Sequence, residues 1–169
     1  MTGKRAIPAA TALLMLGACG LKIPDPVPYL ADCATSDVSQ AGDGEAQFLF
    51  LSSALPDCRS GVLAMAPFRH PVLTYGSGLY RWAAPGEPTP PALMQHGQEQ
   101  WFAAIARQAA SPKAKGRLVV FIHGYNTTFE EAHEMAAKVS KLAGDDVPLV
   151  LLHWPSRAKP LTYAVDEST

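Results

Sequence analysis

The sequence has little charge and no excess of positive charge. Of its 169 residues, 17% are charged, and 14 Lys and Arg stand against 15 Asp and Glu, for a formal net charge of -1. Binding of nucleic acid without regard to its sequence needs a surplus of cations that neutralises phosphates. The charge balance therefore argues against nucleic acid as a partner. The length fits a single domain.

Cysteine is also scarce, with only Cys19, Cys33 and Cys58 in the chain. No two of them form a Cys-x-x-Cys pair, and none belongs to a Cys/His group with the spacing of metal ligands. These absences exclude zinc sites and thioredoxin-like redox chemistry. We expect neither a metal nor another cofactor.

The N-terminus has the three-part pattern of a secretory signal. Lys4 and Arg5 precede an apolar run over residues 6–16, and small residues follow. A helix that crosses a bilayer needs about 20 apolar residues, so this run is too short to be a transmembrane span. Residues 1–18 are therefore predicted to be a signal peptide.

Residues 16–19, with the sequence LGAC, resemble the lipobox of bacterial lipoproteins, in which the cysteine becomes the lipidated first residue. Acyl chains on Cys19 would hold the protein on a membrane without a spanning helix. Since Gly20 and not Asp follows, the resemblance implies an exported lipoprotein anchored in the outer membrane and facing the periplasm. The alternative is an ordinary signal peptide in which the cysteine is incidental.

Residues 19–46 are expected to be the lipidated cysteine and a Pro-rich tether, because Pro24, Pro26 and Pro28 fix the backbone and remove donors. In an oxidising compartment the two remaining cysteines, Cys33 and Cys58, are candidates for a disulfide. Closing that loop would stabilise the fold by about 3 kcal/mol on the chain-entropy account. Two free buried thiols are the alternative.

Hydrophobic periodicity predicts an α/β domain over residues 47–169 with a mostly parallel sheet. Buried strands are expected at 47–51, 117–122 and 147–152, and weaker strands near residue 63 and at 72–75, with Gly76 and Gly78 as breaks. Helices are expected over 98–110 and after residue 128, the second opened by a capping box from Thr127 or Thr128 with Glu130 or Glu131. A Pro-rich loop at 83–91 separates the two halves. In this arrangement the strand at 147–152 lacks a neighbour on one side and forms an exposed edge.

The sequence FIHGYN at 121–126 lies where a buried strand ends and a helix begins, which is where open α/β sheets place their chemistry. Together with the WPS turn at 154–156, residues 117–169 resemble the α/β-hydrolase superfamily, and within it a bacterial esterase-like family of unknown function. The resemblance implies that the domain is a partial α/β-hydrolase fold.

The same resemblance implies that His123, Gly124, Tyr125 and Asn126 form an oxyanion-hole loop. Tyr125 would supply the backbone N–H donor, Gly124 would let the substrate approach closely, and His123 would have a structural role. The alternative is a simple strand-to-helix turn that needs Gly124 for its backbone angle and Asn126 for a local hydrogen bond.

The catalytic triad of this superfamily has no counterpart in the sequence. A G-x-S-x-G nucleophile elbow is missing, and Gly76-Ser77-Gly78 has the wrong spacing and precedes the loop. We therefore assign no catalytic residue and expect the fold to be truncated before its nucleophile. Our hypothesis is the N-terminal portion of a lipid-anchored serine hydrolase that cleaves small acyl esters when intact. The alternative is a short, non-catalytic lipoprotein that serves as a binding or structural module, or that binds a partner completing the sheet.

Other candidate residues are weaker. Ser156 and Lys159 match the S-x-x-K pattern of penicillin-recognising enzymes, but the accompanying motifs are absent. His133 and His153 are interpreted as packing residues, because the sequence positions no nucleophile or carboxylate beside them.

Replacing Cys19 tests the anchor. Serine lacks the thiol that would carry the lipid, so Cys19→Ser should move the protein from the membrane fraction to the soluble fraction. Immunoblotting of the two fractions measures this, and continued membrane retention would refute the anchor.

Overall fold

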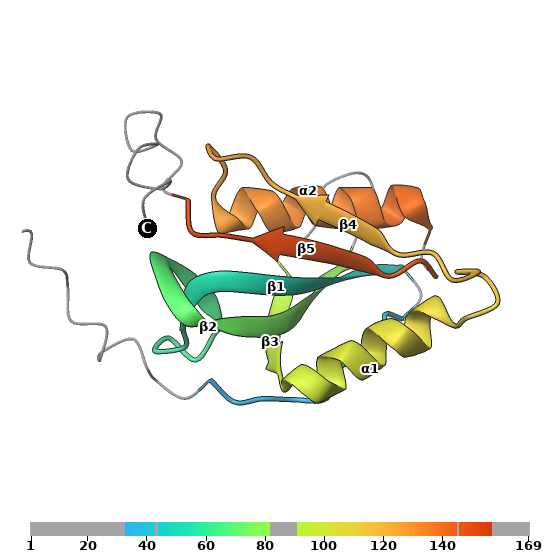
Figure 1. Ribbon diagram of the computed structural model, residues 1–169, viewed down its shortest axis with the longest axis horizontal. Coiled ribbons are helices and arrows are strands. Elements are labelled where there is room, and N and C mark those ends of the chain that lie inside the picture. The colour runs from blue at the N-terminus through green and yellow to red at the C-terminus, as the bar shows by residue number, and fades with distance from the viewer. Residues whose placement is uncertain (1–32, 43, 82–90, 145, 157–169) are drawn as a thin grey trace, which may run out of the picture.

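The computed structural model describes residues 33–42, 44–81, 91–144 and 146–156 (Figure 1). The expected signal peptide, Cys19, the first part of the tether, most of the loop at 83–91 and Lys159 lie outside these residues. The elements are β1 (Glu45–Asp57), β2 (Ala64–Arg81), β3 (Ala92–His96), α1 (Gln98–Ala109), β4 (Val119–Ile122), α2 (Phe129–Ala143) and β5 (Leu149–His153).

The five strands form one sheet in the order β3-β2-β1-β5-β4. β1 pairs with β2 and β2 with β3 in antiparallel fashion, whereas β5 lies parallel to both β1 and β4. The expected α/β class is confirmed. The sheet is mixed and not mostly parallel, because β1 and β2 are joined as a hairpin, and a short turn permits only antiparallel pairing.

β4, α2 and β5 correspond to the strand, helix and strand predicted at 117–122, after residue 128 and at 147–152, and they form a βαβ unit. The structure selects Thr128 as the N-cap of α2, with the complete capping box: the Thr128 side chain accepts from the Glu131 backbone, and the Glu131 side chain accepts from the Thr128 backbone. Gly144 ends the helix with a φ of 99°, a conformation that glycine adopts without strain.

The two helices pack against opposite faces of the sheet, as alternate residues of β1 show. Phe48 and Phe50 belong to the cluster under α2, and Leu49 belongs to a second cluster with Trp101 of α1. Because side chains alternate across a strand, these neighbours point to opposite faces. The core therefore has two layers, one on each face of the sheet at β1.

The expectation that residues 147–152 form the exposed edge is wrong. β5 lies between β1 and β4, and β4 is the edge strand. The residues at 117–122 are correspondingly not buried on both faces: Val120 and Ile122 are 51% and 58% exposed. Among the described elements, α1 packs on β2, and the exposed side chains of Val120 and Ile122 leave part of one sheet face at β4 open.

Gly76 and Gly78 do not interrupt a strand, contrary to expectation, but lie inside β2 opposite Phe50 and Phe48. A Cβ atom at Gly76 would come within 2.0 Å of the Phe50 ring, and one at Gly78 within 2.3 Å of the Phe48 ring. Glycine in a strand interior commonly marks such a close approach. The two phenylalanine rings occupy the space that side chains on β2 would need.

Residues of the expected tether, ahead of residue 47, contact the domain. Cys33 forms a disulfide with Cys58, with their Cα atoms 5.4 Å apart. Beyond it, the Ser36 backbone N–H donates to the Gln95 carbonyl of β3 at 2.9 Å. Thr35 and Ser36 thus lie along the outer edge of β3. Neither helix within the described ranges is long and apolar enough to cross a membrane.

A methyl group at Gly76 tests the packing of β1 on β2. Gly76→Ala should lower the free energy of unfolding by about 1–3 kcal/mol, because the methyl group would collide with the fully buried Phe50 ring and with the Met94 carbonyl oxygen, 2.7 Å away. Urea denaturation measures this. Gly42→Ala is the matched control, since its Cβ would meet only Glu45 Oε2 at 3.4 Å. Equal stability of both variants would contradict the packing account.

Candidate active-site loop

The four residues of the predicted oxyanion-hole loop follow β4 directly and lead into α2. This places them at the carboxyl end of the parallel strands, on the left of the molecule in Figure 1. His123 is buried, whereas Gly124, Tyr125 and Asn126 are exposed. The loop therefore presents its central residues at the end of the sheet where open α/β folds bind ligands.

His123 joins the ends of β4 and β5. Its Nδ1 hydrogen bonds to the Gly124 carbonyl at 2.8 Å, and its Nε2 accepts the Trp154 backbone N–H at 3.2 Å. A carbonyl only accepts, so the Nδ1 carries the proton and the ring is neutral. Burial lowers the pKa of His123 in agreement with this state. With both nitrogens engaged, His123 holds the loop and is not placed to act as a base.

Ser156 provides a second link between the two strand ends. Its hydroxyl donates to the backbone carbonyl of Tyr125. The His123 ring also lies against the Trp154 ring, with centroids 4.5 Å apart. The WPS turn after β5 thus clamps the loop after β4. Ser156 is engaged in this clamp, and its S-x-x-K partner Lys159 lies outside the described residues.

Gly124 is not required by the fold. Its φ is not among the positive values in the described residues, and a Cβ there would meet only Thr127 Oγ1 at 3.8 Å, an ordinary contact. The turn interpretation, in which glycine supplies a special backbone angle, therefore has no support at this position. A glycine without a structural reason is compatible with the close approach of a ligand to the backbone.

A serine–histidine pair that the sequence did not reveal lies beneath the loop. Ser52 Oγ is 2.8 Å from His153 Nδ1, because the parallel register sets Ser52 beside His153. The pair is unsuited to nucleophilic catalysis. Ser52 is completely buried and already accepts the Ala54 backbone N–H at 3.0 Å, so a substrate cannot reach its hydroxyl. The two residues are 101 positions apart, and no local signal connects them.

Two more histidines have the same structural role. His133 is buried on α2 and hydrogen bonds to the Tyr80 hydroxyl, and His96 bonds to Ser77 Oγ at 2.7 Å. Trp101 is likewise a core residue, with its indole N–H donating to the Gly76 carbonyl at 2.9 Å. These contacts agree with the interpretation of His133 and His153 as packing residues.

The described residues contain no group of three or more His, Cys, Asp or Glu side chains able to hold a metal ion. The site that they do contain is a clamped backbone loop at a sheet end. Such a loop can donate backbone hydrogen bonds to a developing negative charge, but it supplies no nucleophile.

Comparison with known families agrees with this picture. Residues 97–169 match the model of a family described as alpha/beta hydrolase of unknown function (DUF900). The match extends from the start of α1 through β4, the loop, α2 and β5. This part of the chain is thus similar to an α/β-hydrolase family whose function is unknown. No curated protein and no solved structure matches the chain.

The buried histidines make stability depend on pH. Burial, with repulsion from His123 and His133, lowers the pKa of His153 from 6.5 to about 3. The unfolded chain therefore binds a proton that the folded chain does not, and stability falls as the pH drops from 6.5 towards 3. At pH 5, proton uptake by His153 in the unfolded chain should by itself lower the free energy of unfolding by about 2 kcal/mol relative to pH 7.5.

Urea denaturation at both pH values measures this loss. His153→Asn is the informative variant, because an amide can bond to Ser52 but does not titrate in this range. The variant should lose less stability than the wild type between pH 7.5 and 5. An identical loss in both proteins would rule out His153 as a source of the acid sensitivity.

Proposed function

We propose that this chain supplies the N-terminal portion of a lipid-anchored serine hydrolase that cleaves acyl esters. The observation that carries the proposal is the clamped loop at the carboxyl end of β4, in a segment of α/β-hydrolase type. Gly124 supports it further, since the fold gives no reason for a glycine there. The lipid anchor is proposed on the lipobox-like sequence at 16–19.

In the proposed reaction, a serine hydroxyl attacks the ester carbonyl and the carbonyl oxygen gains negative charge. The backbone N–H of Tyr125 donates to this oxygen, and the absence of a side chain at Gly124 gives the substrate room to approach. His123 keeps its proton on Nδ1 and positions the loop without exchanging protons. The nucleophile and its acid and base partners come from a further segment, because an oxyanion hole alone does not cleave an ester.

The segment that supplies the nucleophile would join the sheet at β4. All four residues of β4 are apolar, VVFI, and the strand has a described neighbour on one side only. Leu118, directly before β4, and Val120 and Ile122 within it are exposed in alternate positions. An unprotected apolar edge of this kind is a template for another strand. We therefore propose that the completing strand pairs with β4, which brings its end beside the loop.

Two measurements test the proposal. The source DNA is sequenced past codon 169 and translated in all three frames, and a serine elbow followed by an acid and a histidine is expected. The 169-residue chain should not hydrolyse p-nitrophenyl esters above the buffer rate. The chain produced together with the completing segment should hydrolyse them. Turnover by the 169-residue chain alone would contradict the assignment of the nucleophile to a further segment.

Gly124→Ala separates the catalytic role of the loop from its structural role. In the completed enzyme, kcat/KM should fall by about tenfold or more, since small misplacements at a reacting centre are costly. The free energy of unfolding should change little, because the methyl group has space. If no frame contains a serine elbow and the assays show no ester hydrolysis, the alternative is preferred, in which the chain is a short lipoprotein with a non-catalytic binding or structural function.

A further inference from the structure

We propose that the loop end of the domain rests on the lipid bilayer, so that the candidate site takes acyl esters presented by the membrane. This inference rests on the proposed lipid anchor and hydrolase function. Three exposed aliphatic side chains, Val62, Val72 and Leu73, carry it, and we call them the apolar rim. They are 60%, 64% and 44% exposed.

The apolar rim belongs to the β1–β2 hairpin, at the same end of the sheet as the candidate loop. Val62 lies between the two strands, and Val72 and Leu73 lie in β2 just before Thr74, which pairs with Ser52. Ser52 in turn lies beside His153, the last residue of β5. Figure 1 shows the hairpin end and the β4–α2 loop on the same side of the molecule.

Val72 and Leu73 lie in a bulge of β2, outside its regular pairing with β1. Along β1 the pairing passes from Ser52 to Ala54, whereas along β2 it passes from Thr74 to Arg69, so residues 70–73 stand opposite a single residue of β1. Such a bulge removes residues from the regular ladder. His70 Nδ1 bonds to the Val72 carbonyl at 2.8 Å and fixes the bulge.

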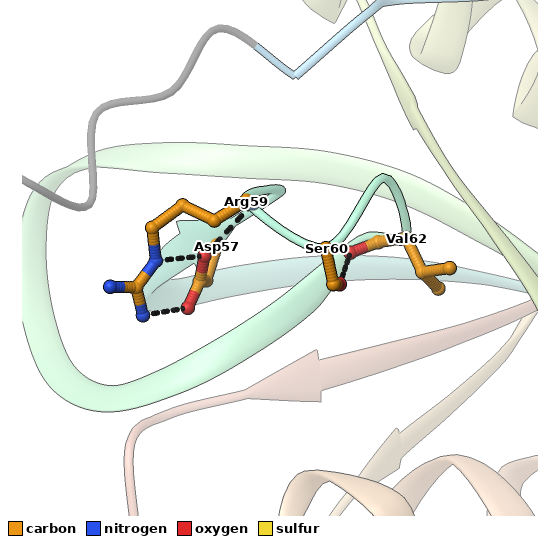
Figure 2. Close-up of polar contacts among 4 residues, drawn as sticks. All are labelled: Asp57, Arg59, Ser60 and Val62. Carbon is orange, nitrogen blue, oxygen red and sulfur yellow. Dashed lines mark hydrogen bonds and ion pairs between the residues drawn. The ribbon is translucent and has the colours of Figure 1, made fainter.

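The turn that carries Val62 is also held in place. Arg59 forms two side-chain hydrogen bonds to Asp57, at 2.8 and 2.6 Å, and the Gly61 N–H donates to the Cys58 carbonyl. Ser60 Oγ donates to the Val62 carbonyl at 3.3 Å, and Figure 2 shows the Val62 side chain directed away from this contact. The turn therefore presents Val62 without needing to rearrange, which lowers the entropic cost of a contact.

The chain enters the domain at this same end. The disulfide ties Cys33 to Cys58, the residue that follows β1. Cys19 precedes Cys33 by 14 residues, which cannot span more than about 50 Å even when fully extended. A lipid on Cys19 would thus tether the domain from its hairpin end, where Cys33 joins Cys58.

A bilayer fits the apolar rim better than a protein partner does. Three aliphatic side chains fall short of the about 800 Å² that each partner buries in a typical stable protein complex. For a chain that is already anchored, the second contact is intramolecular, and even weak insertion is then populated. The occupant that the structure favours is therefore the lipid surface to which the chain is tethered.

Tryptophan quenching in vesicles tests the inference on the full lipidated chain. Val72→Trp is reconstituted into phosphatidylcholine vesicles with or without brominated acyl chains, and the wild-type signal is subtracted. Brominated lipid should lower the added fluorescence at least twofold. Leu142→Trp is the matched control, because Leu142 is 88% exposed in the last turn of α2, at the opposite end, and its signal should not change.

Val62→Trp is a second probe of the rim, in case the bulge does not tolerate the larger side chain, and should be quenched similarly. Flotation of the vesicles reports the anchor separately. If the protein floats but neither rim variant is quenched more than the control, the inference is overturned while the anchor stands. If the protein does not float, both the anchor and the inference fail.

Discussion

The packing of Phe48 and Phe50 against bare backbone is the constraint on which the other features of the domain depend. Both rings are fully buried, and each lies over a glycine of β2, where a side chain would collide with it. On their outer side the rings meet α2, with Phe50 in edge contact with Phe129 at 5.5 Å. Because the two rings lie between the sheet and α2, their close approach to the β2 backbone affects how near α2 packs to the sheet. Phe129 is the first residue of α2 and follows the candidate loop closely, so its contact with Phe50 links the packing on the β2 glycines to the loop.

The loop itself is held by groups from two neighbouring strands. Hydrogen bonds from His123 and Ser156 connect the end of β4 with the end of β5, and both use backbone atoms of the opposite segment. Since the buried imidazole is neutral and both its nitrogens are bonded, the loop has little freedom to change shape. Stiffness of this kind suits a group that must donate backbone hydrogen bonds in a fixed direction, because no reorganisation is then needed as charge develops.

Local features of this fold were readable from the sequence, and features set by strand order were not. The capping box of α2 and the extent of α1 follow from residues within a few positions of one another, and both were predicted. The identity of the edge strand was missed, because an apolar run such as VVFI does not reveal whether its neighbours cover one face or two. The length of β2 was also missed, since Gly76 and Gly78 signal a break locally and make sense only against Phe48 and Phe50. For the same reason, the Ser52–His153 pair became visible only through the register of β1 and β5.

If the chain is anchored at Cys19, as proposed, the Cys33–Cys58 disulfide has a mechanical consequence. Tension applied ahead of Cys33 passes through the sulfur bridge to Cys58 and bypasses the covalent loop between them, which contains all of β1. The central strand of the sheet is therefore shielded from any pull on the tether, and so are the two phenylalanines that seat α2. The pull is borne instead by the hairpin turn after Cys58 and by the start of β2, which pairs with the end of β1.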